Sequence, residues 1–373
     1  MNYKPPKLFD SDNSLDGRWY VHYAYKSPDT GKFERFRTYI SSEILTKTGR
    51  RDEAHKIIKT LNLKLAEGWN PYQYREKKHT NIVASLEEML AVKMATLRKR
   101  TAFTYRNHIK TFTDWLVSAK YTRLRISEFN RYHAQQYADY LKLTANYKNR
   151  TFNNHLMSMK AVFEMLYKRD YLVLNPFSQV NYLPVEEAEL IAFSDSDLRF
   201  IASTLPLYNP RLWLVAQLIY YCFLRPQEIV RLKYGDVDLA RRQIFLSGWQ
   251  TKNKKNEVVD IPDPLIEEFQ KIQWMPANMY IFGKGLEPGY KEQAQTRIDE
   301  VWSRYRKHVE MDKSKTIYAM KHTGVGKLMD TGIDARSIQL QIRHASLDET
   351  QKYLDRFRRR PNQTLRSNFP KLG

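Results

Sequence analysis

The sequence predicts a multidomain protein that is mainly α-helical with small β elements, an α+β fold class. Three observations lead to this prediction. The 373 residues exceed what a single ordinary core organises, so two or three domains are expected. Apolar residues recur at helical spacing from about residue 85 to 180 and through much of the chain beyond residue 190. Alternating, strand-like patterns are confined to two short regions, residues 18–40 and 243–261.

The first section, residues 1–75, predicts a small sheet followed by one helix. Residues 18–40 indicate a hairpin, because four apolar residues alternate, a Pro-Asp-Thr-Gly turn follows, and the strand pattern resumes at Phe33. The helix is predicted by five apolar residues on one face and by Gly68, which suits a C-terminal cap. The residues of the two patterns are Trp19, Val21, Tyr23 and Tyr25 for the strand, and Ala54, Ile57, Ile58, Leu61 and Leu65 for the helix.

The pattern of the middle section, residues 81–180, predicts a group of helices. A polar linker, Arg75 to Thr80, precedes them in the sequence. Ser85-Leu86-Glu87-Glu88 has the pattern of a capping box, which places a helix start at Ser85. Two apolar stripes indicate two further helices, and Asn175-Pro176-Phe177 ends the pattern. The stripes consist of Tyr105, Ile109, Phe112 and Leu116, and of Phe152, Leu156, Met159, Phe163 and Leu166.

The helix of the second stripe also carries polar residues that we place off its apolar face. Arg150, Asn153 and Lys160 are the candidates among them for contacts with DNA phosphates and base edges. Asn149, Asn154 and His155 belong to the same polar set. A solvated helix face explains this composition equally well, so composition alone does not decide between the two interpretations.

The last section, residues 190–373, follows a second linker at Pro184-Val185-Glu186-Glu187 and is helix-rich with one strand region. Gln243 to Ser247 and Glu257 to Ile261 are predicted strands. The polar residues Thr251 to Asn256 lie between them and include Lys252, Lys254 and Lys255. The sequence ends with a basic segment that contains Arg356 and Arg358-Arg359-Arg360.

The charge of the chain favours a polyanionic partner. The net charge is +21 and the pI is about 9.7, among 25 Tyr and 7 Trp residues. Such an excess suits nucleic acid, because neutralised phosphates release counterions. A basic surface that serves only solubility is the alternative. The single cysteine, Cys222, fits a reducing compartment, and residues 1–6 lack the apolar core of a signal peptide. No apolar stretch reaches the roughly 18 residues of a membrane span, so we expect a soluble, cytoplasmic protein.

Several kinds of site have no sequence signal. No Cys/His cluster has zinc-ligand spacing, and no Walker-type glycine-rich loop occurs. No carboxylate set indicates two-metal nuclease chemistry, although scattered acidic residues leave that alternative open. A basic DNA-binding protein with none of these features can still act on phosphodiesters through covalent catalysis.

Two motifs carry a positive signal. Leu224-Arg225 follows an apolar helix, and Glu228 comes three residues later. Further on, Tyr318-Ala319-Met320-Lys321-His322-Thr323 precedes Arg343-His344, and Tyr353 lies nine residues after His344. The ordered set resembles the tyrosine recombinase/phage integrase family. The family pattern is His-x-x-Arg-His-Thr, then a downstream Gly-His, then a Tyr nine residues after that His.

The resemblance extends over nearly the whole chain and implies three domains. Residues 1–75 are similar to an arm-site DNA-binding domain, residues 81–180 to the helical, SAM-like core-binding domain, and residues 190–373 to the mixed α/β catalytic domain. By this resemblance, the chain cuts and rejoins DNA and integrates a phage or another mobile element. It would do so as a synaptic tetramer on double-stranded DNA, with DNA-bending or excision proteins as possible accessories. Neither ATP nor a metal or other cofactor is implied, because one phosphodiester replaces another.

The resemblance also implies the catalytic roles. Tyr353 is the nucleophile and forms a 3′-phosphotyrosine, while Arg225 and His344 bind phosphate oxygens. A planar guanidinium at Arg225 can bind two of these oxygens, and Glu228 can orient it. A lysine in the turn protonates the 5′ oxygen. The resemblance favours Lys252 for that role, with Lys254 and Lys255 as alternatives.

Three positions depart from the family pattern. Tyr318 occupies the usual His position, and Lys321 occupies the usual second Arg position, where it keeps the charge but loses bidentate binding. Arg343 replaces the Gly before His344, which costs about 1 kcal/mol if φ there is positive. His322 matches the family pattern, so it is not counted as a residue that compensates for these three departures.

Two other functions remain as alternatives. A member with a decayed site would bind DNA without a covalent adduct, and a type IB topoisomerase-like enzyme would relax strands with the same chemistry. The survival of Arg225, Lys252, His344 and Tyr353 favours an active recombinase.

Overall fold

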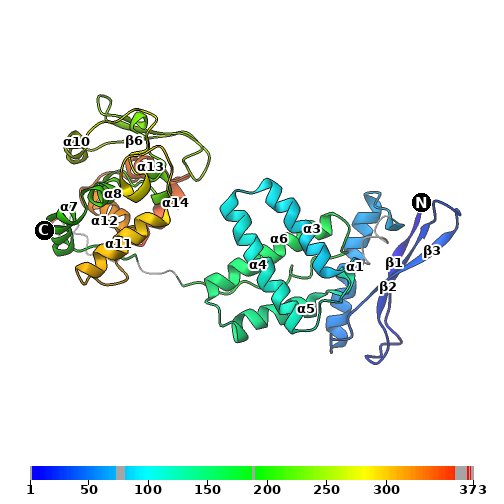
Figure 1. The fold of residues 1–373 in the computed structure, drawn as a ribbon. Coiled ribbons are helices and arrows are strands. Elements are labelled where there is room, and N and C mark those ends of the chain that lie inside the picture. The colour runs from blue at the N-terminus through cyan, green and yellow to red at the C-terminus, as the bar shows by residue number, and fades with distance from the viewer. Residues whose placement is uncertain (1, 73–79, 187–189, 358–367, 369, 371–373) are drawn as a thin grey trace. The chain divides into compact units, whose positions relative to one another are not determined.

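The computed structural model describes residues 2–72, 80–186 and 190–357, and two isolated residues, 368 and 370. These residues fall into two compact units, divided after residue 186 (Figure 1). Most of the expected linker at residues 75–80, Glu187 and the arginines 358–360 lie outside the described residues. The structure thus has two units where the resemblance implies three domains, and that finer division stays a prediction.

The N-terminal unit begins with a three-stranded antiparallel sheet, in the order β1-β2-β3. The hairpin expected at residues 18–40 is confirmed as β2 (Tyr20–Lys26) and β3 (Phe33–Tyr39). The additional strand β1 (Tyr3–Phe9) contains Pro5 and Pro6, and its register with β2 shifts between Lys4 and Lys7. Prolines cannot donate to a ladder and no apolar alternation marks this segment, so the sequence pattern did not predict it.

Helix α1 (Lys47–Ala66) packs against this sheet. Its buried residues Ala54, Ile57, Leu61 and Leu65 are the predicted apolar face, and Gly68 has φ 87° just beyond the helix, as its capping role requires. Trp19, Val21 and Tyr23 of the sheet complete this core together with Val173, which follows the last helix of the unit. The sheet and helix α1 therefore share a core with the helical part of the unit.

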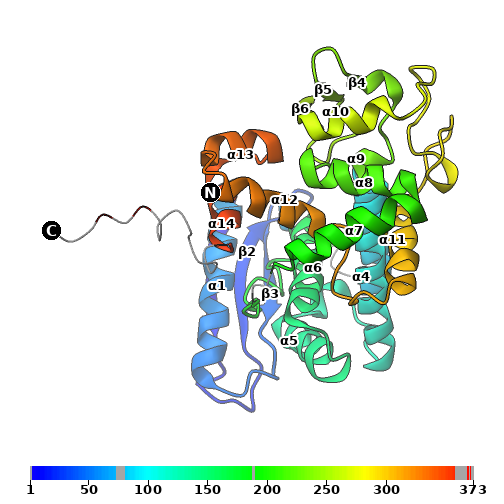
Figure 2. The same cartoon turned by 90° about the vertical axis from the view of Figure 1, so that its left-hand side faces the viewer.

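The helical part contains four α-helices among its described residues, which are labelled in Figure 1 and seen from a second side in Figure 2. They are α3 (Ile82–Thr96), α4 (Lys99–Ser118), α5 (Arg131–Asp139), which continues as a π turn at Tyr140–Thr144, and α6 (Asn149–Lys168). Their core joins both predicted stripes, with Phe112 in edge-on contact with Phe129, Tyr137 and Phe163. The two helices predicted from the stripes are therefore confirmed.

Two expectations for this region are wrong. Helix α3 begins at Ile82 rather than at Ser85, because Asn81 caps it by accepting the backbone N–H of Val83 at 2.9 Å. Ser85 is buried inside the helix and donates to the carbonyl of Asn81. His155 is buried as well, with its ring centroid 3.9 Å from that of His108 and the two rings tilted by 34°, and so does not belong to the polar face of α6.

The C-terminal unit surrounds helix α8 (Pro210–Tyr221), which packs against several helices, four of them with eight or more residues. These are α7 (Asp195–Tyr208), α10 (Asp263–Gln270), α11 (Thr296–His308) and α12 (Ala319–Asp330). Arg225 caps the start of the short helix α9 (Pro226–Ile229), His344 follows α13 (Ala335–Ile342), and Tyr353 lies on α14 (Leu347–Asp355). A second three-stranded sheet consists of β4 (Val237–Asp238), β5 (Gln243–Leu246) and β6 (Glu257–Asp260), which confirms the two predicted strands to within a residue.

Two packing features place the helices that carry the site. Gly324 lets α12 approach α8 closely, since a Cβ there would lie 2.2 Å from the carbonyl oxygen of Tyr220. A small separate core then fixes α13 and α14 against α12. It consists of Phe223, Val325, Ile338, Ile342, Leu354 and Phe357, with Tyr353 packed at its edge. Within the described ranges, no helix combines the length and the apolar character needed to cross a membrane.

The aromatic centre of the helical part should dominate its stability. Phe112 has no exposed surface, so Phe112→Ala should lower the free energy of unfolding by about 3–5 kcal/mol through lost burial and a cavity. Phe103→Ala on the same helix, where the side chain is 59% exposed, should change it by less than about 0.5 kcal/mol. Urea denaturation followed by circular dichroism measures both values, and equal effects would contradict this account of the core.

Candidate active site

The centre of the site is Arg225, which stands at the N-terminal cap of α9 just before Pro226. Glu228 accepts hydrogen bonds from the Arg225 backbone N–H at 2.8 Å and from its Nη1 at 2.9 Å. The Glu228 side chain is 1% exposed, whereas that of Arg225 is 26% exposed. The carboxylate therefore orients the guanidinium from inside, and one side of the guanidinium remains accessible to a ligand.

Arg343 holds the same carboxylate from its other side. Its Nη2 lies 2.8 Å from Oε2 of Glu228, and its Nη1 lies 2.9 Å from Oε2 of Glu257 on β6. Burial alone would raise the pKa of Glu228, but Arg343 and Arg225 outweigh burial and lower it. Two buried carboxylates and two guanidiniums thus form one ion-paired network that joins α9, β6 and the end of α13.

The backbone at Arg343 has the positive φ that the family pattern suggested. Arg343 ends α13 with φ 63° and ψ 47°, in the left-handed region. A residue with a Cβ costs about 1 kcal/mol more than glycine there. The paired, buried side chain offsets that strain.

Lys321 lies on α12 behind Arg225 and is only 3% exposed. Its Nζ donates to the carbonyl of Phe223 at 3.1 Å, and the same carbonyl accepts from Nη2 of Arg343 at 3.4 Å. Burial, followed by the nearby charges of Arg225 and Arg343, lowers the pKa of Lys321 to about 7. The expectation that Lys321 keeps its charge stays a prediction, because this lowered pKa lies close to neutral pH.

Tyr353 lies on α14 and points its hydroxyl at His322. The oxygen is 2.6 Å from Nδ1 of His322, and the rings of His344 and Phe357 contact the tyrosine ring edge-on. Burial raises the pKa of Tyr353 above its usual range. Burial, with Arg356 and Lys321, lowers the pKa of His322 to about 4. His322 is therefore neutral, and full transfer of the tyrosine proton to it is strongly unfavourable in the free protein.

Tyr318 and His344 complete the surroundings of the nucleophile. The Tyr318 ring is edge-on to His322 with centroids 5.6 Å apart, and Nζ of Lys321 lies 5.9 Å from the Tyr318 centroid. Nδ1 of His344 is 3.1 Å from the hydroxyl of Thr350, and burial lowers its pKa. Five of the six predicted catalytic residues are thus connected through direct contacts or through Glu228, Arg343 and His322.

Lys252 lies apart in the turn between β5 and β6 and is exposed, as are Lys254 and Lys255. The base of this turn is fixed by Gln250, which is 1% exposed. Its amide donates to the carbonyl of Arg231 and to the carboxylate of Asp236, and its oxygen accepts the N–H of Ser247. The choice of one lysine as the general acid stays a prediction.

The three residues proposed on α6 have different environments. Asn153 donates to the carbonyl of Leu183 at 2.7 Å and accepts its N–H at 2.9 Å, so its amide ties the following segment to the helix. Nζ of Lys160 lies 4.4 Å from the centre of the Tyr182 ring. Arg150 is exposed. This arrangement gives Asn153 a structural role. Of the two cations, Lys160 and Arg150, Arg150 is the exposed one.

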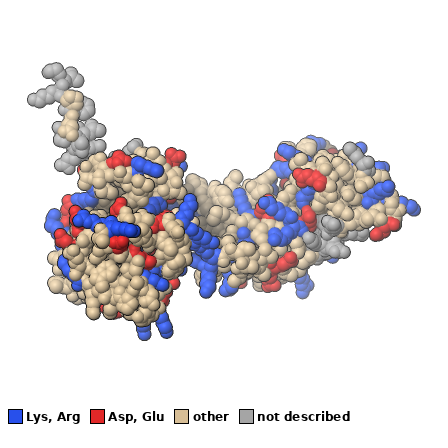
Figure 3. Space-filling model, turned by 90° about the horizontal axis from the view of Figure 1, so that it is seen from above, with Lys and Arg blue, Asp and Glu red and all other residues tan. Residues whose placement is uncertain are grey.

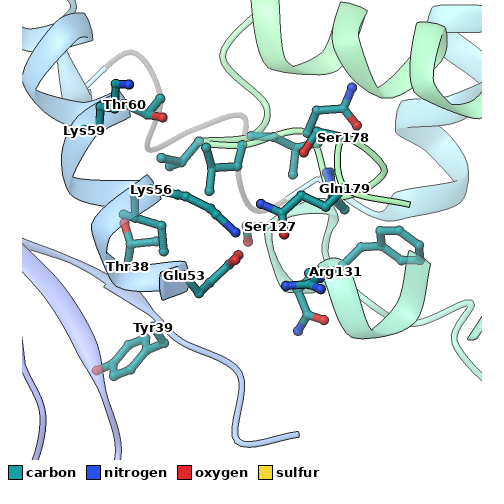
Figure 4. A pocket seen from close by; sticks show the side chains of 18 residues that line it. Thr38, Tyr39, Glu53, Lys56, Lys59, Thr60, Ser127, Arg131, Ser178 and Gln179 are labelled. Atoms are coloured by element: carbon teal, nitrogen blue, oxygen red, sulfur yellow. The ribbon is translucent and has the colours of Figure 1, made fainter. Parts of the chain in front are cut away.

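A cavity of about 340 Å³ occurs in the N-terminal unit, but it contains none of the predicted catalytic residues. Figure 4 shows Glu53 and Lys56 of α1 pointing into it, opposite Ser127, Arg131 and Gln179. Elsewhere, no group of three or more His, Cys, Asp or Glu side chains among the described residues is placed to hold a metal ion.

The sequence interpretation left out two residues that the structure places in the site. His322 was set aside because it matches the family pattern, and its contact with Tyr353 spans 31 residues of sequence. Arg343 was noted only as a departure, and its partners Glu228 and Glu257 are 115 and 86 residues away. The spacing of nearby residues in a sequence does not predict contacts between residues so far apart along the chain.

Comparison with known proteins gives matches along most of the chain. Residues 187–360 match the model of the phage integrase family, and residues 81–182 match that of the phage integrase SAM-like domain. The chain is 25% identical over 277 residues to tyrosine recombinase XerC of Syntrophus aciditrophicus, covering 69% of this chain and 88% of that protein. It is 24% identical over 303 residues to tyrosine recombinase XerD of Rickettsia bellii, covering 73% and 92%.

Solved structures share the fold. A lambda integrase dimer bound to a COC′ core site superposes with a TM-score of 0.62 at 14% identity, covering 99% of this chain and 98% of that one. The Tn1549 transposon integrase in complex with a circular intermediate DNA gives a TM-score of 0.58 at 14% identity, covering 75% and 98%. With both family models and the curated relatives in agreement, the chain belongs to the tyrosine recombinase/phage integrase family.

Proposed function

We propose that this chain is a site-specific DNA recombinase that cuts and rejoins strands through a 3′-phosphotyrosine at Tyr353. The observation that carries the proposal is a continuous chain of contacts. Tyr353 and His344 connect through His322 and Tyr318 to Lys321. Lys321 connects through the Phe223 carbonyl, Arg343 and Glu228 to Arg225. This set supports the proposal because covalent phosphoryl transfer requires a nucleophile together with cations and hydrogen-bond donors suited to one phosphate.

The proposed reaction exchanges one phosphodiester for another. The oxygen of Tyr353 bonds to phosphorus, the bond from phosphorus to the 5′ oxygen breaks, and a lysine of the β5–β6 turn, Lys252 by preference, protonates the leaving oxygen. Arg225 and His344 stabilise the charge on the phosphorane oxygens. A 5′ hydroxyl of a partner site then attacks the phosphotyrosine and releases the enzyme.

The bound phosphate also changes Lys321. A negative charge next to this amine favours its protonated form, which opposes the effect of burial and of the two arginines. Lys321, the second cation of the site, is therefore fully charged only when DNA is bound. This resting state is the one feature that favours a non-catalytic DNA-binding protein as the alternative function.

We propose in addition that residues 1–75 bind DNA through the outer face of their sheet. Strand pairing aligns Lys7, His22 and Arg37 in one row and Phe9, Tyr20 and Tyr39 in the next. The guanidinium of Arg37 lies 5.1 Å from the Tyr20 ring. Lys and Arg side chains are distributed over the visible face of each unit (Figure 3). A basic, aromatic sheet face of this kind suits phosphate and base contacts.

The assembly and setting follow from the family. One neighbour is a lambda integrase tetramer bound to a Holliday junction, with a TM-score of 0.60 at 14% identity. We propose that this chain also acts as a synaptic tetramer on double-stranded DNA in the cytoplasm. Its three parts would bind arm sites, bind core sites and cleave, in the service of a phage or another mobile element, with DNA-bending or excision proteins as accessories.

Strand cleavage is tested with nicked suicide duplexes that carry a site selected by the protein from a random pool. The wild-type chain should form an SDS-resistant adduct, and Tyr353→Phe should form none, because the attacking oxygen is missing. Tyr290→Phe, at a side chain that is 62% exposed in the same unit, serves as the control and should react like wild type. Absence of an adduct with wild type on a tightly bound site would contradict the enzymatic proposal.

The sheet face is tested by the salt dependence of binding. Arg37→Ala should weaken binding to arm-site duplexes and lower the slope of log K against log salt by about one, as expected for one lost phosphate contact. Lys47→Ala, at an exposed position on α1, is the matched control. Fluorescence anisotropy measures both, and equal slopes for the two variants would rule out a phosphate contact by Arg37.

A further inference from the structure

Arg343 is buried where a residue with a side chain is disfavoured. Its side chain is 4% exposed, and its backbone is left-handed at φ 63°. Its guanidinium pairs with two carboxylates, Glu228 and Glu257, on two other elements. The strained position is therefore occupied by the side chain that connects α13 to α9 and β6.

Arg343 acts on Arg225 through a shared carboxylate. Oε2 of Glu228 accepts both the backbone N–H of Arg225 and Nη2 of Arg343, while Oε1 accepts Nη1 of Arg225. With Glu228 1% exposed, no water competes for these bonds. Removing Arg343 leaves the carboxylate with its two bonds to Arg225 but without its link to α13, so the guanidinium of Arg225 is held less firmly.

Arg343 and Lys321 also share an acceptor. The carbonyl of Phe223 receives Nζ of Lys321 at 3.1 Å and Nη2 of Arg343 at 3.4 Å. A guanidinium is larger than an ammonium group and has five N–H donors in a fixed plane. With Arg343 in place, an arginine at position 321 would bring a second guanidinium to the carbonyl that Nη2 of Arg343 already contacts.

We propose that Arg343 is a positioning residue for strand cleavage, which orients Arg225 through Glu228. Together with Lys321, Arg343 also fills the space that a larger cation at position 321 would need. The inference rests on the proposed function of the same site. It makes positions 321 and 343 interdependent: lysine is accommodated at 321 because arginine stands at 343.

The charged groups that act on Lys321 are Arg225, Arg343, Glu228 and Glu257. The titratable side chains of Tyr318, His322 and His344 also face it. Arg343 is one of the two cations that lower the pKa of Lys321. If cleavage requires a charged Lys321, its rate falls as pH rises through that pKa, and removal of Arg343 shifts the fall to higher pH.

The test uses the full chain with nicked suicide duplexes in single-turnover reactions, and compares Arg343→Gly, Arg343→Lys, Lys321→Arg and the double variant Lys321→Arg/Arg343→Gly. Glycine suits the left-handed backbone, so Arg343→Gly adds no backbone strain. Each single glycine or arginine variant should cut the rate of adduct formation by about ten- to hundredfold with little change in DNA affinity. Arg343→Lys should keep part of the activity, because one ion pair remains possible.

The double variant gives the decisive comparison. It should react faster than either single variant, because glycine at 343 makes room for the guanidinium at 321. Three results would each overturn the inference. Arg343→Gly could cleave at the wild-type rate, or the double variant could cleave no faster than the rate expected from multiplying the two single-variant losses. The pH profile of Arg343→Gly could also match that of wild type. If Arg343→Gly fails to fold, the double variant and Arg343→Lys still decide it. An inactive wild type would instead refute the proposed function.

Discussion

The buried carboxylate of Glu228 is the interaction on which the catalytic unit depends. An isolated carboxylate at 1% exposure would be very unfavourable, but Arg225 and Arg343 pair with it and hold its pKa below the usual range. Through these two arginines it joins the start of α9 to the end of α13, and Arg343 extends the connection to β6. Breaking such a buried network from one side typically costs about 3–5 kcal/mol, because it leaves an unpaired charge.

This network explains why the free protein is in a resting state. The two arginines that Glu228 fixes also act with burial to keep Lys321 partly neutral. Tyr353 meanwhile keeps its proton, which it shares in a hydrogen bond with a neutral His322. The hydroxyl of Tyr353 is thus held in place and still protonated. In the proposed function, a phosphate bound at Arg225 would supply the negative charge that favours protonation of Lys321, so substrate binding would also complete the charge of the site.

The sequence predicted the features that depend on local spacing. The hairpin with Trp19 and Val21, the stripes of α4 and α6, and the strands around Lys252 follow from periodicity, and the structure confirms them. Ordered motifs also identified Arg225 and Tyr353 together with the intervals between them. Features that arise from packing were not predictable. Asn81, not Ser85, caps helix α3, and His155 is buried beside His108. Arg343 pairs with residues that are distant in the sequence.

The most direct test of this account is proton uptake when the full chain binds its selected DNA site at pH 8, measured by titration calorimetry in buffers of different ionisation enthalpy. With a pKa of about 7, Lys321 is roughly nine-tenths neutral at that pH, and a bound phosphate raises the pKa. The account predicts that wild type takes up protons on binding and that Lys321→Met takes up fewer. Lys327→Met, at a surface ion pair on the same helix, should match wild type. Equal uptake by wild type and Lys321→Met would contradict the claim that DNA completes the charge of this site.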